Sequence, residues 1–244
     1  MKTFQKNHVA PGFTLIELLI VMAISTIIVA AVYSAYVTQN KIYNNQEAVA
    51  EMQQNLRAGL GALTRDIRMS GYDLLATADS GFVDSVSFSD GASPTPQTET
   101  VFSSSTQIAF TADLDGDGTI DLLPEDIDGN TIIDMTEMEQ IAYRLNGTNL
   151  ERYSTTTGTT EWQIIAEDID NLEFQYLDQA GNPTADLDAV YTITVSILAR
   201  SGRSEPDFNN NQTYSTASGA NWTVNDNFRR RFLIRTIHCR NMGL

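Results

Sequence analysis

The sequence predicts an α+β fold, in which one long N-terminal α-helix packs against a mostly antiparallel β-sheet. An apolar run over residues 11–36 continues into a stretch with helical periodicity, and no proline occurs between residues 13 and 70. After Gly71, short apolar runs alternate with Gly, Asn, Asp, Ser and Thr, as strands alternate with turns. The length of 244 residues suffices for one domain in addition to a long helix.

Residues 13–36 are long enough to cross a bilayer as an apolar helix, and Glu17 is the one charge within them. A carboxylate in such a segment is costly and usually marks function. It becomes tolerable when a cation pairs with it.

A short leader precedes this helix, with Lys2, Lys6 and a Gly12-Phe13 junction directly before the apolar run. A secretory signal peptide also begins with basic residues, but its cleavage site follows the apolar core, so cleavage removes that core. Cleavage at Gly12-Phe13 would keep it. The strongest alternative is a plain transmembrane anchor, which has no need for Glu17.

The helix is expected to continue beyond the membrane-length segment, over residues 37–71, with one apolar face. Residues three or four positions apart form that face, which is the spacing of a helical stripe. Its members are Val49, Met52, Leu56, Leu60, Leu63 and Ile67. Gly59 and Gly61 weaken the helix locally, and Ser70-Gly71 is a plausible end.

The rest of the chain predicts a β-rich head. The expected strands are Ser85–Ser89, Thr106–Ala112, Gln140–Leu145, Asn149–Ser154, Asn171–Leu177, Val190–Ala199 and Arg230–Cys239. Asn146-Gly147 predicts a tight hairpin, and Tyr191, Ile193, Val195 and Ile197 should share one face of their strand. Residues 201–227 are rich in Ser, Asn, Gly and Asp and are expected to form a long exposed loop.

The composition excludes several classes of function. The formal net charge is -16, and loss of Lys2 and Lys6 with the leader would bring it to -18, which argues against nucleic-acid binding. Cys239, the only cysteine, is expected to be a buried strand residue. Arg229, Arg230 and Arg231 are expected to lie on solvated faces or to pair with acids. No phosphate loop, nucleophile elbow or other catalytic constellation occurs, so we expect no enzyme.

An acidic tandem over residues 113–138 resembles EF-hand-like or dockerin-like calcium loops. In the first copy the candidate ligands are Asp113, Asp115, Asp117, the peptide oxygen of Thr119, Asp121 and Glu125, which lies one residue beyond the usual position of the last ligand. In the second copy they are Asp126, Asp128, Asn130, the peptide oxygen of Ile132, Asp134 and Glu137.

Each copy departs from the calcium-loop pattern in one place. Pro124 occupies the position of the bidentate carboxylate in the first, and Thr131 occupies the position of the turn glycine in the second. The alternative is a solvated Asp-Gly loop. The density of carboxylates favours binding, because their mutual repulsion would hold an empty loop open. We therefore predict one or two calcium ions.

The order of basic leader, Gly12, Phe13, Glu17 and apolar helix resembles the class III signal of type IV pilins and of type II secretion pseudopilins. The resemblance implies that prepilin peptidase cleaves between Gly12 and Phe13 and that the new Phe13 amine is N-methylated. It also implies that residues 13–36 anchor the subunit and later form the filament core. Glu17 would neutralise a Phe13 amine, its own or a neighbour's, during assembly.

Later segments are similar to PilW-type minor pilins, relatives of the J-type pseudopilins. These segments are RDIRMSGY at 65–72, IAYRL at 141–145, IDNLEFQYLD at 169–178, ITVSILARS at 193–201 and RTIHCRN at 235–241. The resemblance implies a leader over 1–12, a helix in two parts over 13–36 and 37–71, and a head over 72–244.

That resemblance implies a subunit held in the bacterial inner membrane by a single pass and then carried into an extracellular pilus. It implies initiation of assembly and a place at the pilus tip. The implied partners are other minor pilins, the major pilin, prepilin peptidase and the inner-membrane assembly platform. The nearest alternative is a J-type pseudopilin of type II secretion. An alternative from another class is a membrane-tethered calcium-binding adhesin or sensor.

Overall fold

The structure is a computed structural model that describes residues 12–73, 81–89, 98–113, 120, 139–154 and 162–242. The chain divides into two compact units, Met1–Glu47 and Ala48–Leu244. Helix α1 (Leu15–Met69) runs through both. The α+β fold is confirmed, since every strand pair among the described residues is antiparallel.

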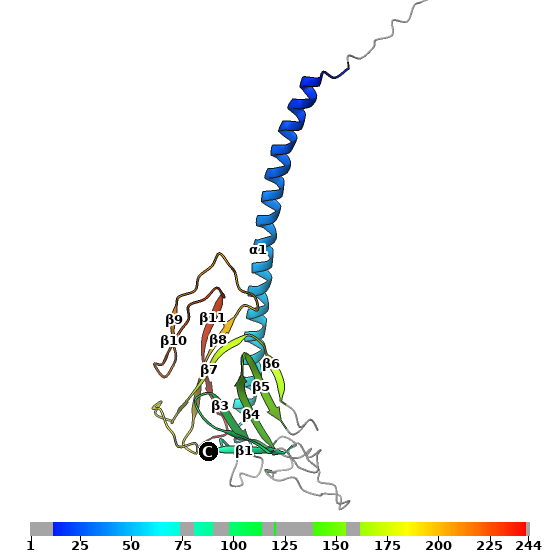
Figure 1. Cartoon of the computed structure of the whole chain (residues 1–244). Coiled ribbons are helices and arrows are strands. Elements are labelled where there is room, and N and C mark those ends of the chain that lie inside the picture. The colour runs from blue at the N-terminus through cyan, green and yellow to red at the C-terminus, as the bar shows by residue number, and fades with distance from the viewer. Residues whose placement is uncertain are drawn as a thin grey trace, which may run out of the picture. The chain divides into compact units, whose positions relative to one another are not determined.

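Four sheets make up the described strands of the head (Figure 1). The four-stranded sheet has the order β3-β4-β5-β6, and its strands are β3 (Gln107–Thr111), β4 (Gln140–Asn146), β5 (Asn149–Ser154) and β6 (Gln163–Ala166). The three-stranded sheet has the order β11-β8-β7, and its strands are β7 (Ile169–Leu177), β8 (Thr192–Arg200) and β11 (Arg230–His238). Two-stranded sheets join β1 (Ser85–Ser89) to β2 (Thr98–Phe102) and β9 (Thr213–Ser215) to β10 (Asn221–Thr223).

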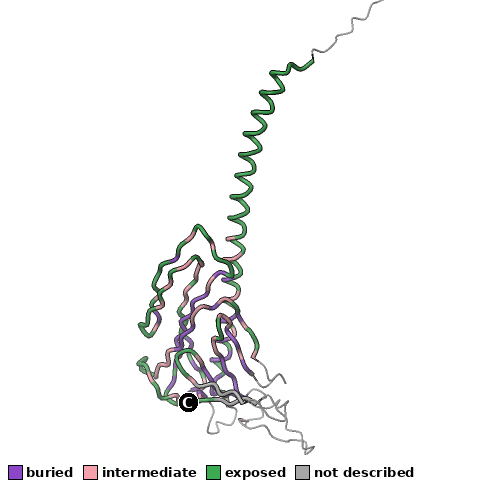
Figure 2. Tube along the Cα trace, in the orientation of Figure 1, coloured by how far each residue is buried: buried purple, intermediate pink, exposed green. Residues whose placement is uncertain are grey.

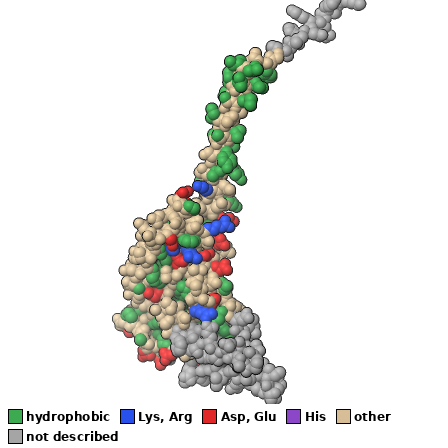
Figure 3. Space-filling view, in the orientation of Figure 1, with side chains coloured by type: hydrophobic (Ala, Val, Ile, Leu, Met, Phe, Trp, Pro, Cys, Tyr) green, Lys and Arg blue, Asp and Glu red, His purple; other side chains and the backbone are tan. Residues whose placement is uncertain are grey.

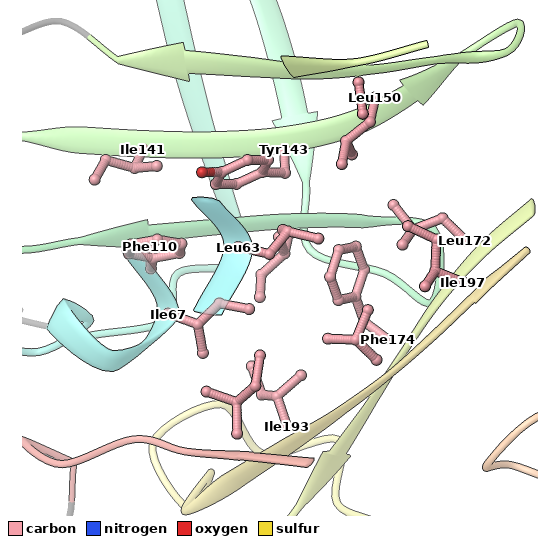
Figure 4. Close-up of a cluster of buried hydrophobic side chains, with 14 of the residues drawn as sticks. Leu63, Ile67, Phe110, Ile141, Tyr143, Leu150, Leu172, Phe174, Ile193 and Ile197 are labelled. Carbon is pink, nitrogen blue, oxygen red and sulfur yellow. The ribbon is translucent and has the colours of Figure 1, made fainter. Parts of the chain in front are cut away.

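The second half of α1 supplies its apolar stripe to the core of the head, as predicted. Leu63 and Ile67 are fully buried (Figure 4). The four-stranded sheet contributes the labelled side chains Phe110, Ile141, Tyr143 and Leu150, and the three-stranded sheet contributes Leu172, Phe174, Ile193 and Ile197. Figure 2 shows buried residues concentrated in these strands. Burial of this stripe supplies the hydrophobic free energy that holds the helix in the head.

The two glycines of the helix have different surroundings. Gly59 is buried, and a Cβ there would lie 2.9 Å from Leu150 Cδ2 and 3.2 Å from Ala166 Cβ. A Cβ at Gly61 would meet nothing within 4 Å. Gly59 therefore lets α1 approach β5 and β6 closely, which its weak helix propensity alone did not reveal.

Alanine at these two positions is expected to have different effects on the stability of the head. Gly61→Ala should raise the free energy of unfolding by about 1 kcal/mol, because alanine is the better helix former. Gly59→Ala should forfeit that gain, since crowding Leu150 costs about 1–3 kcal/mol. Chemical denaturation of the two variants in parallel measures the difference; equal stability would contradict the close approach at Gly59.

A buried carboxylate links the end of α1 to the four-stranded sheet. Asp66, 2% exposed, accepts hydrogen bonds from Tyr143 Oη at 2.7 Å and Arg152 Nε at 2.6 Å. It also accepts one from the exposed Arg65 Nε at 2.8 Å. Burial alone would raise the pKa of Asp66, but these donors and the Arg152 charge outweigh burial and lower it. Burial, followed by the Asp66 charge, raises the pKa of Tyr143, which stays a neutral donor.

Each predicted strand is confirmed within two residues at both ends. The Asn146-Gly147 turn joins β4 to β5, with Gly147 at φ +60°. The predicted loop over 201–227 is mostly exposed, as expected, but it also contains the two short strands β9 and β10, which the sequence did not indicate. Thr216 donates a hydrogen bond to Glu173 of β7 at 3.0 Å, and Ala217 N–H donates one to Ser196 Oγ of β8 at 3.0 Å. The hairpin formed by β9 and β10 thus covers the outer face of the three-stranded sheet. The polar sequence of residues 201–227 did not indicate this contact.

Contact with this hairpin explains why buried and exposed residues do not alternate along β8. Ile193, Val195 and Ile197 share one face, as predicted, and that face is buried. Leu198 and Ser196 on the opposite face are buried too. Tyr191 precedes the strand and is 40% exposed, so it does not belong to the buried face.

The arginine and cysteine predictions are confirmed in outline. Arg229 pairs with Glu205 at 2.7 Å, and the nearly buried Arg230 pairs with Asp170 at 2.6 Å and with Asp226. The bond from Arg230 lowers the pKa of Asp226 to about 2. Cys239 is buried, although it lies one residue beyond β11, and burial raises the pKa of its thiol to about 11.

Candidate functional site

The first turn of α1 brings Thr14 and Glu17 together. Thr14 N–H and Thr14 Oγ1 each donate a hydrogen bond to Glu17 Oε2 at 2.9 Å, and Glu17 N–H donates one to Thr14 Oγ1 at 3.3 Å. This reciprocal arrangement of an N-cap threonine with a glutamate three residues later is a capping box. It satisfies amide groups that a helix start leaves without partners.

Thr14 had no expected role, although Thr14-Leu15-Ile16-Glu17 carries the sequence signal of a capping box. The capping box fixes the Glu17 carboxylate at the helix start, where the helix dipole favours negative charge. Gly12 and Phe13 lie immediately before it, and Phe13 is 89% exposed. The processing junction and the carboxylate are thus held within one helical turn.

The surface that follows is apolar. Every residue from 12 to 44 is exposed, and Figure 3 shows hydrophobic side chains gathered along this part of the helix. Large side chains exposed here include Leu15, Ile16, Leu18, Ile24, Ile27, Val29, Val32, Tyr33 and Tyr36. Among the described residues, α1 is the one helix long and apolar enough to cross a membrane. An apolar surface of this extent requires a bilayer or neighbouring chains to cover it.

The predicted calcium ligands are mostly outside the described residues. Asp113 is described; the other ligands, at positions 115, 117, 119, 121, 125, 126, 128, 130, 132, 134 and 137, are not. Asp113 follows β3, is buried, and donates its N–H to Tyr72 O at 2.8 Å. Within the described residues, no three His, Cys, Asp or Glu side chains are placed to hold a metal ion. The calcium site stays a prediction.

Comparison with known proteins agrees with the N-terminal geometry. Residues 10–33 match the prokaryotic N-terminal methylation motif. Residues 45–218 match the family described as prepilin peptidase-dependent protein B, which spans more than half of the chain. None of the curated proteins matches.

Among solved structures, a type IV-like pilin from Thermus thermophilus is similar at 14% sequence identity with a TM-score of 0.41. The match covers 79% of this chain and 98% of that one. From the two sequence matches, the chain belongs to the prepilin peptidase-dependent protein B family and is a type IV pilin-like protein of the minor-pilin kind.

Proposed function

We propose that this protein is a PilW-type minor pilin that helps to initiate a type IV pilus and lies at its tip. One observation carries the proposal: the Gly12-Phe13 junction precedes an exposed apolar helix that begins with a fixed carboxylate. Cleavage at this junction yields a new amine and leaves the helix attached to the head. The protein then acts by association, and catalysis has no part in the proposal.

Assembly follows from two physical requirements. The apolar surface of residues 13–36 leaves the membrane only if neighbouring helices replace the lipid around it. The Phe13 amine enters that apolar bundle at low cost only if a carboxylate neutralises it. Glu17 is the acid available within the segment, and the head supplies contacts that distinguish this subunit from others.

A deletion strain distinguishes the pilus from type II secretion. Loss of surface pili and of twitching, with normal secretion of enzymes, is expected for a minor pilin. The chain should also be scarce relative to the major pilin and should be labelled at pilus ends by gold-conjugated antibody. Lost secretion with intact pili would instead identify a J-type pseudopilin, and labelling along the whole fibre would contradict a tip position.

We also propose that residues 113–138 bind calcium. This segment leaves and re-enters the sheet at neighbouring positions, because Thr111 pairs with Gln140 and Ala112 N–H donates to Glu139 O at 3.3 Å. The sequence places carboxylates at alternate positions of this segment, which suits a hard ion that takes six to eight oxygen ligands.

Removal of calcium is expected to destabilise the head. Binding at a hundredfold excess over the dissociation constant contributes about 2.7 kcal/mol, so a chelator should lower the melting temperature and re-added calcium should restore it. Asp115→Asn with Asp126→Asn should abolish the response, whereas Asp186→Asn, elsewhere on the head, should leave it intact. Identical melting curves with calcium and with chelator would contradict the proposal.

A further inference from the structure

Strand β11 presents a backbone edge to which no described strand is paired. It is the outer strand of the sheet β11-β8-β7, beside β8 in Figure 1. Ser201 N–H donates to Arg229 O at 2.8 Å, and Cys239 N–H donates to Tyr191 O at 3.1 Å. Because bonded and non-bonded pairs alternate in an antiparallel ladder, odd-numbered residues of β11 bond to β8. The even-numbered residues direct their N–H and C=O groups away from the sheet.

The C-terminal half of this edge of β11 is exposed to solvent. Ile234, Thr236 and His238 are exposed, with Ile234 at 47%. The hairpin covers the strand near Phe232, where Tyr214 and Trp222 contact its ring at centroid distances of 5.7 and 5.9 Å. Three residues beyond this contact therefore offer outward-pointing backbone groups to an added strand.

The same strand carries two exposed arginines, Arg231 and Arg235, on its other face. Within the described part of the chain, neither takes part in an ion pair, whereas the nearby Arg229, Arg230 and Arg200 all do. Two arginines outside any ion pair among the described residues thus lie on a strand edge that no described strand covers. Their charge complements an acidic ligand.

A groove lies at the N-terminal end of β11. It has a volume of about 380 Å³ and is lined by Val49, Met52 and Gln53 of α1, by residues 208–212 and by Arg231.

We propose that the free edge of β11 binds an extended acidic segment of another protein as an added strand, with Arg231 and Arg235 pairing its carboxylates. Main-chain hydrogen bonds supply affinity in such strand addition, and side chains supply specificity. A second copy of β11 that pairs antiparallel about Leu233 would set Arg231 opposite Arg235 twice, and like charges directly opposite are destabilising. This inference does not depend on the filament role.

The test uses the full mature chain in detergent micelles and two fluorescent nine-residue peptides, matched in length to β11. One alternates Glu with Val and the other alternates Lys with Val. The Glu peptide should bind roughly tenfold more tightly than the Lys peptide, and added salt should reduce the difference. Arg231→Glu with Arg235→Glu should reverse the preference.

Hydrogen exchange locates the binding. In the free protein, the amides of Ile234, Thr236 and His238 should exchange faster than those of Leu233, Arg235 and Ile237. The Glu peptide should slow the first set alone. Thr236→Pro removes one outward N–H, which an edge strand tolerates, and should abolish binding, whereas Thr236→Val should retain it.

Several results would overturn the proposal. These are equal or absent binding of the two peptides, unchanged exchange at the even-numbered amides, and undiminished binding by Thr236→Pro. A dimer of the mature chain that dissociates on charge reversal would show that a second copy occupies the edge instead.

Discussion

Replacement of Asp66 by alanine is expected to lower the free energy of unfolding of the head by about 3–5 kcal/mol. The substitution removes the acceptor for Arg152, whose side chain is 15% exposed, and for the fully buried Tyr143. Breaking a buried pair by removing one partner has an effect of this size, because the remaining charge is left uncompensated. Denaturant unfolding of the mature chain in detergent measures the change.

Controls separate the buried contacts from the exposed one. Arg65→Ala removes a partner that is 67% exposed and should cost at most about 1 kcal/mol. Tyr143→Phe removes one donor and should cost about 1–3 kcal/mol. If Asp66→Ala is no more destabilising than Arg65→Ala, the network does not join the helix to the sheet as described.

The lowered pKa of Asp66 also predicts an acid dependence. A carboxylate whose pKa is lower in the folded state contributes stability above its unfolded pKa, and that contribution is lost as the pH falls through the folded value. Part of the wild-type stability should therefore disappear below about pH 4. Asp66→Asn should start less stable at neutral pH and lose less over the same range. Parallel pH profiles for the two proteins would contradict the role given to this carboxylate.

Glu17→Ala is expected to leave cleavage at Gly12 largely intact but to reduce the amount of this subunit in filaments about a hundredfold. The physical reason is that an unpaired buried charge costs about 3 kcal/mol or more, and the Phe13 amine would then enter the helical bundle without a counter-charge. Quantitative blotting of sheared filaments against total membranes measures incorporation.

The capping box allows a control that separates the helix-capping role of Glu17 from its charge. Glutamine in place of Glu17 can still form a capping box with Thr14, but it carries no charge. Glu17→Gln should therefore fail to assemble as Glu17→Ala does, while Thr14→Ala, which weakens the cap by about 1 kcal/mol, should assemble nearly normally. Normal incorporation of Glu17→Gln would show that Glu17 serves the helix start and not charge neutralisation. Lost cleavage with normal assembly of the matured fraction would contradict the pairing role as well.

The sequence predicted correctly the elements in which the spacing of apolar residues matches the face that is buried. The stripe from Met52 to Ile67 repeats at helical spacing because one face of α1 enters the core, and the structure buries that face. The Asn146-Gly147 turn was predictable because Gly147 adopts a positive φ that favours glycine.

The failures arose where tertiary contacts override local composition. Trp222 and Tyr214 lie in a polar segment, yet their rings pack on Phe232 of the following strand β11. Burial of Ser196 and Leu198 depends on this same hairpin, so the alternation of β8 alone could not indicate it. Asp66 gave no signal either, because its donors Tyr143 and Arg152 come from strands far along the chain.

The N-terminal site was predicted in its chemistry but not in its geometry. The positions of Gly12, Phe13 and Glu17 indicated the processing motif, whereas the bond from Thr14 to Glu17 depends on how the first helical turn closes. Glu17 has a partner within its own chain before any neighbour arrives.

Mass spectrometry of this protein from sheared surface filaments and, separately, from inner membranes tests the central claim most directly. We expect an N-terminal peptide that begins at methylated Phe13 and is present in the filament fraction. Its presence in membranes alone would favour the pseudopilin. A chain that retains Met1 or an unmodified leader in both fractions would contradict the account and favour a membrane-tethered protein that never enters a filament.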